Sequence, residues 1–188
     1  MSSVITGRGD RGLSDTRDHH RVPKFDLRLE AVGTIDELSC FIGAARVQLH
    51  DHPEQAAHLL ELQRDLYRLN AEVATVDPAR LGDLRLLGPG DVKKLEQWIH
   101  ALETTVPPPA AFVLPGGGNP VSAAADVCRA VCRRAERSLA VFFSRQGSAD
   151  GDTSALIYLN RCSDYFFLLA LFLADVRDLA VSPAPEKA

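Results

Sequence analysis

Residues 112–137, FVLPGGGNPVSAAADVCRAVCRRAER, decide the fold of this chain. A glycine-rich turn runs directly into a long predicted helix. Asn119 can cap that helix, and Pro120 suits its first position, where a missing N–H costs no hydrogen bond. An apolar stripe then recurs at spacings of three and four residues: Val121, Ala124, Cys128, Val131, Ala135 and Leu139. The pattern predicts a helix with one face in a hydrophobic core.

The same helix carries a second, cationic stripe. Arg129, Arg133 and Arg137 repeat every four residues, and Glu136 stands beside them. Planar guanidinium donors fixed in a row suit phosphate or carboxylate groups. A row of surface ion pairs would show the same spacing. The spacing alone therefore leaves both a binding site and a solvated face open.

Composition places the chain among single-domain globular proteins. Its 188 residues are 46% hydrophobic and 24% charged, which is enough for one substantial core. The net charge of −4 gives no case for nucleic acid as a partner. The N-terminus lacks the apolar core of a signal peptide, and the most apolar run, residues 165–174, is shorter than the roughly 20 residues that span a bilayer. We expect a cytoplasmic protein with no membrane partner, and a buried helix over that run.

Four cysteines fall inside predicted helices: Cys40, Cys128, Cys132 and Cys162. No CxxC pair and no nearby histidine completes a zinc site. We expect small core residues of a reduced protein, and no bound metal at these positions.

Residues 1–27 form a glycine-rich arm with almost no periodic apolar pattern. Such a segment is disordered, or is ordered by a ligand or partner. Within it, TGRGDRG (residues 6–12) would let backbone N–H groups approach an anion closely. The stretch lacks the GK[ST] ending of a Walker A loop, and a mobile tail would look the same. The pattern alone does not decide between an anion-binding loop and a loose end.

Four further helices are predicted from apolar residues at spacings of three and four. They are expected after a capping box at Thr34 and Glu37, from Pro53 to Val76, from Asp91 to the prolines at 107–109, and from about Thr153 to Val176. Residues before Thr34 are either an irregular lead-in or an extra turn, and the helix that follows Asn119 runs to about Ser144. No period-two strand pattern is present. We therefore predict an all-α, five-helix up-down bundle over residues 28–176, with the arm at 1–27 and a disordered tail at 177–188.

Taken together and in order, five segments resemble the ATP:cob(I)alamin adenosyltransferases of the five-helix-bundle, propanediol-utilisation type. They are TGRGDRGLS (6–14), RVPKFDLRLEAVGTIDELSCFIG (21–43), FVLPGGG (112–118), CRAVCRRAER (128–137) and LNRCSDYFF (159–167). The resemblance extends from Thr6 to Val176. It implies a homotrimer that binds ATP and a corrin in clefts between subunits. Cobalt(I) would attack the 5′ carbon of ATP, giving adenosylcobalamin and triphosphate.

The resemblance also assigns roles to single residues. The positions implied for ATP, bound with Mg²⁺, are Thr6, Gly7, Gly9, Asp10, Gly12, Ser14, Lys24, Arg28, Glu30, Arg133, Glu136, Arg137 and Asn160. The positions implied for catalysis are Arg129, Arg133, Glu136, Asp36 and Phe112. Asp36 would pair with Arg129 across the subunit interface, and Phe112 and Arg129 would bind cobalamin, the second substrate. The product would pass to an adenosylcobalamin-dependent acceptor enzyme.

The chemistry of the residues agrees with these roles. Cobalt(I) is itself a strong nucleophile, so no catalytic Ser, Cys or base is required. The protein has to align donor and acceptor and to stabilise a triphosphate leaving group. An apolar group under the corrin would exclude water and an axial ligand. Phe112 suits that task, although a buried core Phe would also explain the residue.

The chain departs from the family pattern mainly in the arm. Gly7 and Arg8 stand where a basic residue and then Thr are usual, His20 replaces a usual Gly, and Ser39 replaces a frequent Asn. These changes bear on nucleotide affinity and on ordering of the arm. The alternative function is therefore a non-catalytic cobalamin-binding carrier or sensor. The retained arginine stripe and Asn160 favour catalysis, because a carrier needs no triphosphate clamp.

Overall fold

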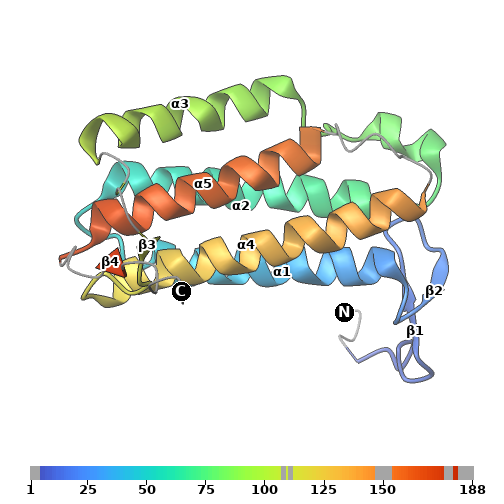
Figure 1. Ribbon diagram of the computed structural model, residues 1–188. Helices are drawn as coiled ribbons and strands as arrows, with labels where there is room; N and C mark the ends of the chain where they lie inside the picture. Colours follow the sequence, from blue (N-terminus) through green and yellow to red (C-terminus); the bar gives the residue numbers. More distant parts are fainter. Residues whose placement is uncertain (1–4, 107–108, 110–111, 147–153, 176–179, 182–188) are drawn as a thin grey trace, which may run out of the picture.

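The computed structural model describes residues 5–106, 109, 112–146, 154–175 and 180–181. Five α-helices alternate in direction along one bundle (Figure 1). They are α1 (Leu27–Arg46), α2 (Pro53–Val73), α3 (Pro89–Thr105), α4 (Pro120–Arg145) and α5 (Ser154–Leu173), with a short 3-10 helix, η1 (Pro78–Asp83), between α2 and α3. The predicted five-helix bundle is confirmed.

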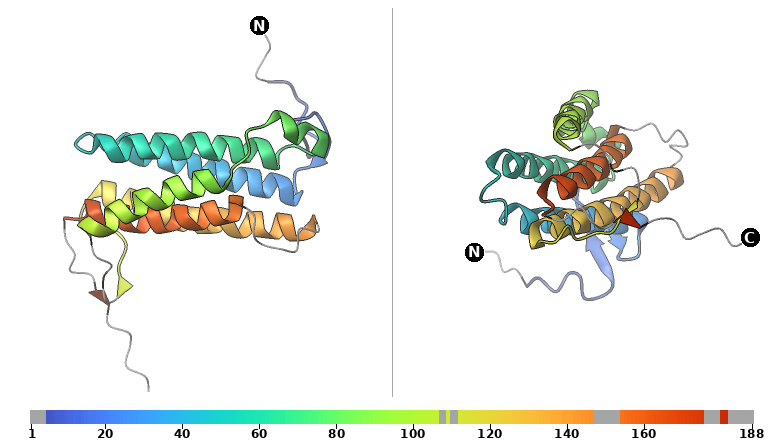
Figure 2. Two further views of the ribbon diagram at one scale, coloured as in Figure 1. Left: turned by 90° about the horizontal axis from the view of Figure 1, so that it is seen from above. Right: turned by 60° about the vertical axis from the view of Figure 1, so that its left-hand side comes forward.

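The packing is organised around α5. This helix contacts α4 and α3, while α1 contacts α4 and α2 (Figures 1 and 2). Among the fully buried side chains of α5 are Tyr158, Tyr165 and Phe166. The hydroxyl of Tyr158 donates a hydrogen bond to Oδ2 of Asp65 on α2 at 2.6 Å, which satisfies a buried polar group. The core is therefore built on α5, with α3 added against its outer side.

By length and composition α5 could cross a membrane, since Ser154–Leu173 has a mean hydropathy of 1.4. Its apolar surface is used inside the protein, because 61% of the apolar window is buried. The run at 165–174, expected as a buried helix, contributes Leu168, Leu169 and Ala170 to the core. The helix is a core element of the bundle.

Two helices begin earlier than their predicted caps. Asp26 caps α1, its carboxylate accepting from the backbone N–H of Arg28 at 2.8 Å. Thr34 lies inside α1 and donates back to the carbonyl of Ala31, so the extra turn is real and the capping box is not. Helix α3 begins at Pro89, after the N-cap residue Gly88. Asp91 is the third residue of the helix, and its carboxylate accepts from the backbone N–H of Gly88 at 3.0 Å. For α4 the prediction is confirmed, since Asn119 accepts from the N–H of Ser122 at 2.8 Å.

Short strands stand outside the expected all-helical pattern. Strands β1 (Leu13–Asp15) and β2 (Arg21–Pro23) form an antiparallel hairpin within the arm. Strands β3 (Phe112–Val113) and β4 (Ala180–Val181) pair next to the start of α4 (Figure 1). Strand β4 falls within the tail predicted to be disordered, so that prediction does not hold for these two residues. Strands of two or three residues are too short to show a period-two pattern.

Three of the four cysteines are core residues, as expected. Cys128, Cys132 and Cys162 are buried. Burial raises the pKa of the Cys128 thiol to about 12, which keeps it protonated and unreactive. Cys40 is exposed on α1, contrary to the prediction. The buried stripe of α1 runs through Leu38 and Ile42, and position 40 falls on the other side of the helix.

Candidate functional site

A groove between α4 and α5 collects much of the predicted nucleotide site. Its volume is about 550 Å³. It is lined by Arg133, Glu136, Arg137, Ala140, Leu156, Ile157, Asn160 and Arg161. Four predicted ATP-binding residues, Arg133, Glu136, Arg137 and Asn160, are thus brought together by two helices. Arg161 is a lining residue that the sequence analysis did not assign.

Hydrogen bonds fix the polar groups of this groove. The Asn160 side-chain N–H donates to Oε1 of Glu136 at 3.2 Å. Nη1 of Arg161 donates to Oδ1 of Asn160 at 2.8 Å. Arg133 and Arg137 are exposed. Two accessible guanidinium groups beside an ordered amide and one carboxylate suit a polyanionic ligand that carries a cation.

Arg129 and Asp36 do not join this groove. Arg129 lies one turn before Arg133 on α4, and its Nε donates to Oδ1 of Asp126 at 3.3 Å. Asp36 is exposed on α1. Within one chain, Arg129 therefore pairs with a neighbour on its own helix, and its pairing with Asp36 between subunits stays a prediction.

The glycine-rich turn before α4 is held from both sides. The N–H of Gly116 donates to Oδ2 of Asp126 at 2.9 Å, and the N–H of Asp175 donates to the carbonyl of Gly117 at 2.9 Å. Gly117 has φ +52°, and a Cβ there would lie 2.1 Å from the hydroxyl oxygen of Ser122. Only glycine fits this position. The turn therefore has a fixed shape where the start of α4 meets the end of α5.

Phe112 lies just before that turn and is 80% exposed. Its backbone pairs with that of Val181. The interpretation of Phe112 as a core residue is wrong for this chain. An exposed ring on a fixed strand is suited to contact a ligand or a second subunit.

The turn of the arm closes on Lys24. The N–H of Asp10 donates to the carbonyl of Gly7, and the N–H of Lys24 donates to the carbonyl of Gly12 at 2.9 Å. A Cβ on Gly9 would lie 3.3 Å from the Lys24 ammonium nitrogen. Thr6 and Ser14 border this turn. The structure therefore gathers the predicted glycines and the lysine into one exposed, cationic turn.

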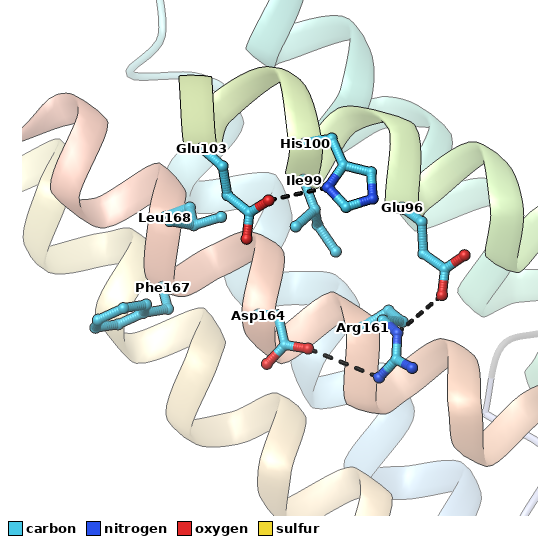
Figure 3. A pocket seen from close by; sticks show the side chains of 8 residues that line it. All are labelled: Glu96, Ile99, His100, Glu103, Arg161, Asp164, Phe167 and Leu168. Atoms are coloured by element: carbon cyan, nitrogen blue, oxygen red, sulfur yellow. Dashed lines mark hydrogen bonds and ion pairs between the residues drawn. The ribbon is translucent and has the colours of Figure 1, made fainter. Parts of the chain in front are cut away.

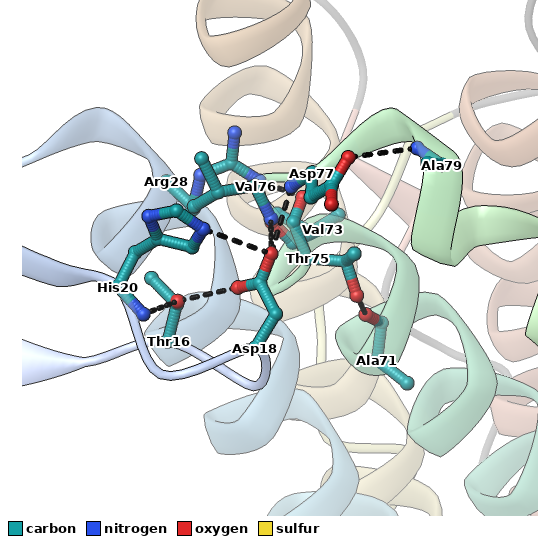
Figure 4. A network of polar contacts seen from close by, with 10 residues as sticks. All are labelled: Thr16, Asp18, His20, Arg28, Ala71, Val73, Thr75, Val76, Asp77 and Ala79. Atoms are coloured by element: carbon teal, nitrogen blue, oxygen red, sulfur yellow. Dashed lines mark hydrogen bonds and ion pairs between the residues drawn. The ribbon is translucent and has the colours of Figure 1, made fainter.

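The base of the arm is anchored by Asp18, which the sequence analysis did not single out (Figure 4). Its carboxylate accepts from the hydroxyl of Thr16 at 2.6 Å and from the backbone N–H groups of Val76 and Asp77 at 2.9 and 2.7 Å. Burial opposes the charged form, but these hydrogen bonds outweigh it and hold the pKa of Asp18 well below its usual range. The expectation of an arm ordered only by a ligand or partner does not hold for residues 13–23, because polar contacts within the chain attach them to the end of α2.

Arg28 and Glu30 stand apart from the predicted nucleotide residues. Nη1 of Arg28 donates to the carbonyls of Val73 and Thr75, and its guanidinium lies 4.8 Å from the centre of the Phe142 ring. This side chain braces the start of α1 against the ends of α2 and α4. Glu30 is exposed. Their roles in ATP binding stay predictions.

The chain is similar to known corrinoid adenosyltransferases along most of its length. A model of the cobalamin adenosyltransferase family matches residues 4–173. The chain is 40% identical over 178 residues to the corrinoid adenosyltransferase MMAB of Homo sapiens, covering 93% of this chain and 70% of that protein. It is 37% identical over 174 residues to a cobalamin adenosyltransferase of Cupriavidus metallidurans, covering 92% of this chain and 89% of that protein.

Solved structures share the fold. One is a Phe-to-Ala variant of a PduO-type ATP:corrinoid adenosyltransferase from Lactobacillus reuteri, complexed with cobalamin and ATP. It matches with a TM-score of 0.77 and 29% identity, over 90% of this chain and 92% of that one. An Arg-to-Lys variant complexed with ATP matches with a TM-score of 0.76 and 28% identity, over 90% and 93%. Sequence and fold agree over nearly the whole chain, which therefore belongs to the cobalamin adenosyltransferase family.

Proposed function

We propose that this chain transfers the 5′-deoxyadenosyl group of ATP to the cobalt(I) of a corrinoid such as cobalamin. The products are adenosylcobalamin and triphosphate. The observation that carries this proposal is the α4–α5 groove, where Arg133, Arg137, Glu136 and Asn160 meet. A carrier that only holds a corrinoid would have no use for two accessible guanidinium groups beside an ordered amide.

The groove and the arm would stabilise the triphosphate leaving group. Arg133 and Arg137 offer permanent positive charge. Lys24 and the glycine turn offer an ammonium group and backbone N–H groups. Mg²⁺ fits this donor set, since it takes oxygen ligands from phosphates and water with few protein carboxylates. Among the residues that line the groove, Glu136 supplies the carboxylate for such an ion. When bound, Mg²⁺ would neutralise phosphate charge.

Phe112 would serve the corrin rather than the nucleotide. Its exposed ring would cover the lower face of the corrin and exclude water and an axial base. A cobalt without an axial ligand is easier to reduce to the nucleophilic +1 state. No general base is needed, because the nucleophile carries no proton.

Assembly would complete the site. Arg133 and Arg137 lie about 20 and 26 Å along α4 from Pro120, at about 1.5 Å per residue, whereas β3 pairs with β4 near the start of α4 (Figure 1). Within one chain, Phe112 therefore lies far from the α4–α5 groove. A homotrimer, with Asp36 of one copy against Arg129 of the next, would place the two halves together. We place this trimer in the cytoplasm, delivering its product to an adenosylcobalamin-dependent enzyme.

Product analysis tests the proposal. Chemically reduced cobalamin, Mg-ATP and the protein, mixed without oxygen, should yield adenosylcobalamin and triphosphate in equal amounts, measured by chromatography and phosphorus NMR. Release of ADP and phosphate would contradict adenosyl transfer. Tight cobalamin binding without either product would support the carrier.

A further inference from the structure

We propose that Arg161 and Glu96 are positioning residues that fix the amide orientation of Asn160 in the nucleotide groove. The inference rests on the proposed function of that groove. It adds α3 to a site that otherwise belongs to α4 and α5. Neither residue is among the positions that the resemblance assigned.

Four side chains form a continuous chain of hydrogen bonds across three helices. Glu96 on α3 accepts from Nε of Arg161 on α5 at 3.0 Å (Figure 3). Nη1 of Arg161 donates to Oδ1 of Asn160 at 2.8 Å, and Nδ2 of Asn160 donates to Glu136 on α4 at 3.2 Å. The chain runs from the outer helix into the groove.

The donor and acceptor types leave one orientation for the amide. Arg161 has donors only, so it can face the oxygen of the Asn160 side chain but not its nitrogen. Glu136, when ionised, has acceptors only, so it must face the nitrogen. A flipped amide would put donor against donor and acceptor against acceptor. The second N–H of Asn160 is then available to a nucleotide acceptor, such as a ring nitrogen or ribose oxygen.

Glu96 decides where the Arg161 guanidinium lies. A second carboxylate, Asp164, lies 3.9 Å from Nη1 of Arg161, one turn further along α5. Glu96 binds Nε at 3.0 Å and so holds the fork with Nη1 toward Asn160. Without Glu96, Asp164 would be the nearest anion, and Figure 3 shows it on the side of Arg161 toward Phe167. The orientation of Asn160 would then lose its support.

The same pocket provides a matched control. Glu103 and His100 form a second polar pair on α3, with Oε2 of Glu103 2.9 Å from Nδ1 of His100 (Figure 3). Both line the pocket that Glu96 and Arg161 line. Glu103→Gln also removes one negative charge from α3, but it leaves the hydrogen bonds that connect Glu96, Arg161 and Asn160 unchanged.

NMR of the free protein tests the orientation directly. The chain has three asparagines, so selective ¹⁵N-asparagine labelling gives three side-chain amide pairs, and Asn160→Asp identifies one of them. Glu96→Gln should shift the Asn160 amide pair and speed its exchange with water, whereas Glu103→Gln should leave both unchanged. An Asn160 amide that is the same in Glu96→Gln and wild type would overturn the proposal, whether or not ATP binds.

Nucleotide affinity supplies the second readout. Glu96→Gln removes the charge that holds Arg161 in place, so Asn160 should lose roughly one hydrogen bond to the nucleotide. Mg-ATP binding should weaken about fivefold, with an unchanged melting temperature. In an Asn160→Ala background the same substitution should have no further effect. Additive losses would show that Glu96 acts by another route. A wild-type protein that does not bind Mg-ATP would defeat the proposed function, and the amide spectrum would still decide the positioning.

Discussion

Oδ2 of Asp18 lies 2.7 Å from the backbone nitrogen of Asp77, 59 residues further along the chain (Figure 4). This bond joins the base of the N-terminal arm to the corner between α2 and η1. The backbone N–H of Arg17 adds a bond to the carbonyl of Ala74 at 3.0 Å. Hydrogen bonds within the chain therefore attach the arm to the bundle.

Replacing Asp18 by Asn should loosen the arm and destabilise the protein. The substitution keeps the shape but removes the charge that strengthens three hydrogen bonds, and an amide nitrogen can no longer accept. We expect a loss of about 2–3 kcal/mol in the free energy of unfolding, measured by urea denaturation at fixed protein concentration. Asp15→Asn, which breaks more exposed ion pairs with Arg8 and Arg21, should cost less than about 1 kcal/mol. Equal losses of unfolding free energy in the two variants would contradict the anchoring role of Asp18.

The contribution of Asp18 should depend on pH in a defined direction. Its pKa is held well below the usual value of 3.8, so the folded protein favours the carboxylate more than the unfolded chain does. The stabilisation is present above the unfolded pKa and is lost as the pH falls toward the folded one. The difference in unfolding free energy between wild type and Asp18→Asn should be constant above about pH 5 and shrink below pH 4, by up to about 1.4 kcal/mol per pH unit. A difference that stays constant down to pH 3 would refute this account.

Arg133→Lys should impair turnover at the groove. Lysine keeps the charge but loses the planar fork that bonds two phosphate oxygens. We expect kcat/KM to fall roughly tenfold or more, equivalent to about 1.4 kcal/mol. Arg134→Lys is the matched control, because Arg134 pairs with Glu37 and does not line the groove. Unchanged turnover in Arg133→Lys would show that Arg133 is only structural.

Phe112→Ala should abolish turnover without loss of stability. The ring is 80% exposed, so its removal should change the unfolding free energy by less than about 0.5 kcal/mol. ATP should still bind. Cobalt(II)alamin on the variant should remain five-coordinate, as seen by visible and EPR spectroscopy, because water or a base can reach the lower face. A variant that still gives four-coordinate cobalt(II) would exclude the corrin-facing role.

Asp36→Ala should weaken assembly or nucleotide binding. Removal of one partner from a buried ion pair costs about 3–5 kcal/mol, and the pairing proposed for Asp36 and Arg129 would be buried between subunits. Sedimentation equilibrium should show a trimer for wild type and dissociation of the variant at lower concentration. Asp51→Ala, an exposed position in the loop after α1, should leave the trimer intact. A wild-type protein that is monomeric at all concentrations would exclude the trimer.

Local signals explain what the sequence could predict. Asn119 and Pro120 sit next to the helix they begin, and the cationic stripe needs only the helical repeat to align Arg133 with Arg137. Asn160 entered through the family resemblance. The sequence leaves the start of α1 open, because Thr34 and Glu37 match a capping box while the actual cap, Asp26, is a single residue without a motif.

Contacts between distant residues explain what the sequence could not predict. Asp18 bonds to backbone groups 58 and 59 residues away, and backbone donors leave no mark on the sequence. Glu96 reaches Arg161 across 65 residues. The resemblance implies ATP binding for Arg28, whereas in the structure its guanidinium donates to the backbone carbonyls of Val73 and Thr75 at the end of α2.

The visible spectrum of reduced cobalamin with the protein, recorded with and without Mg-ATP, tests the central claim most directly. The account predicts that the cobalt(I) spectrum is replaced by that of adenosylcobalamin only when both protein and Mg-ATP are present. Arg133→Lys should slow this conversion, and Arg134→Lys should not. A cobalt(I) spectrum that persists with wild-type protein and saturating Mg-ATP would contradict adenosyl transfer at the α4–α5 groove.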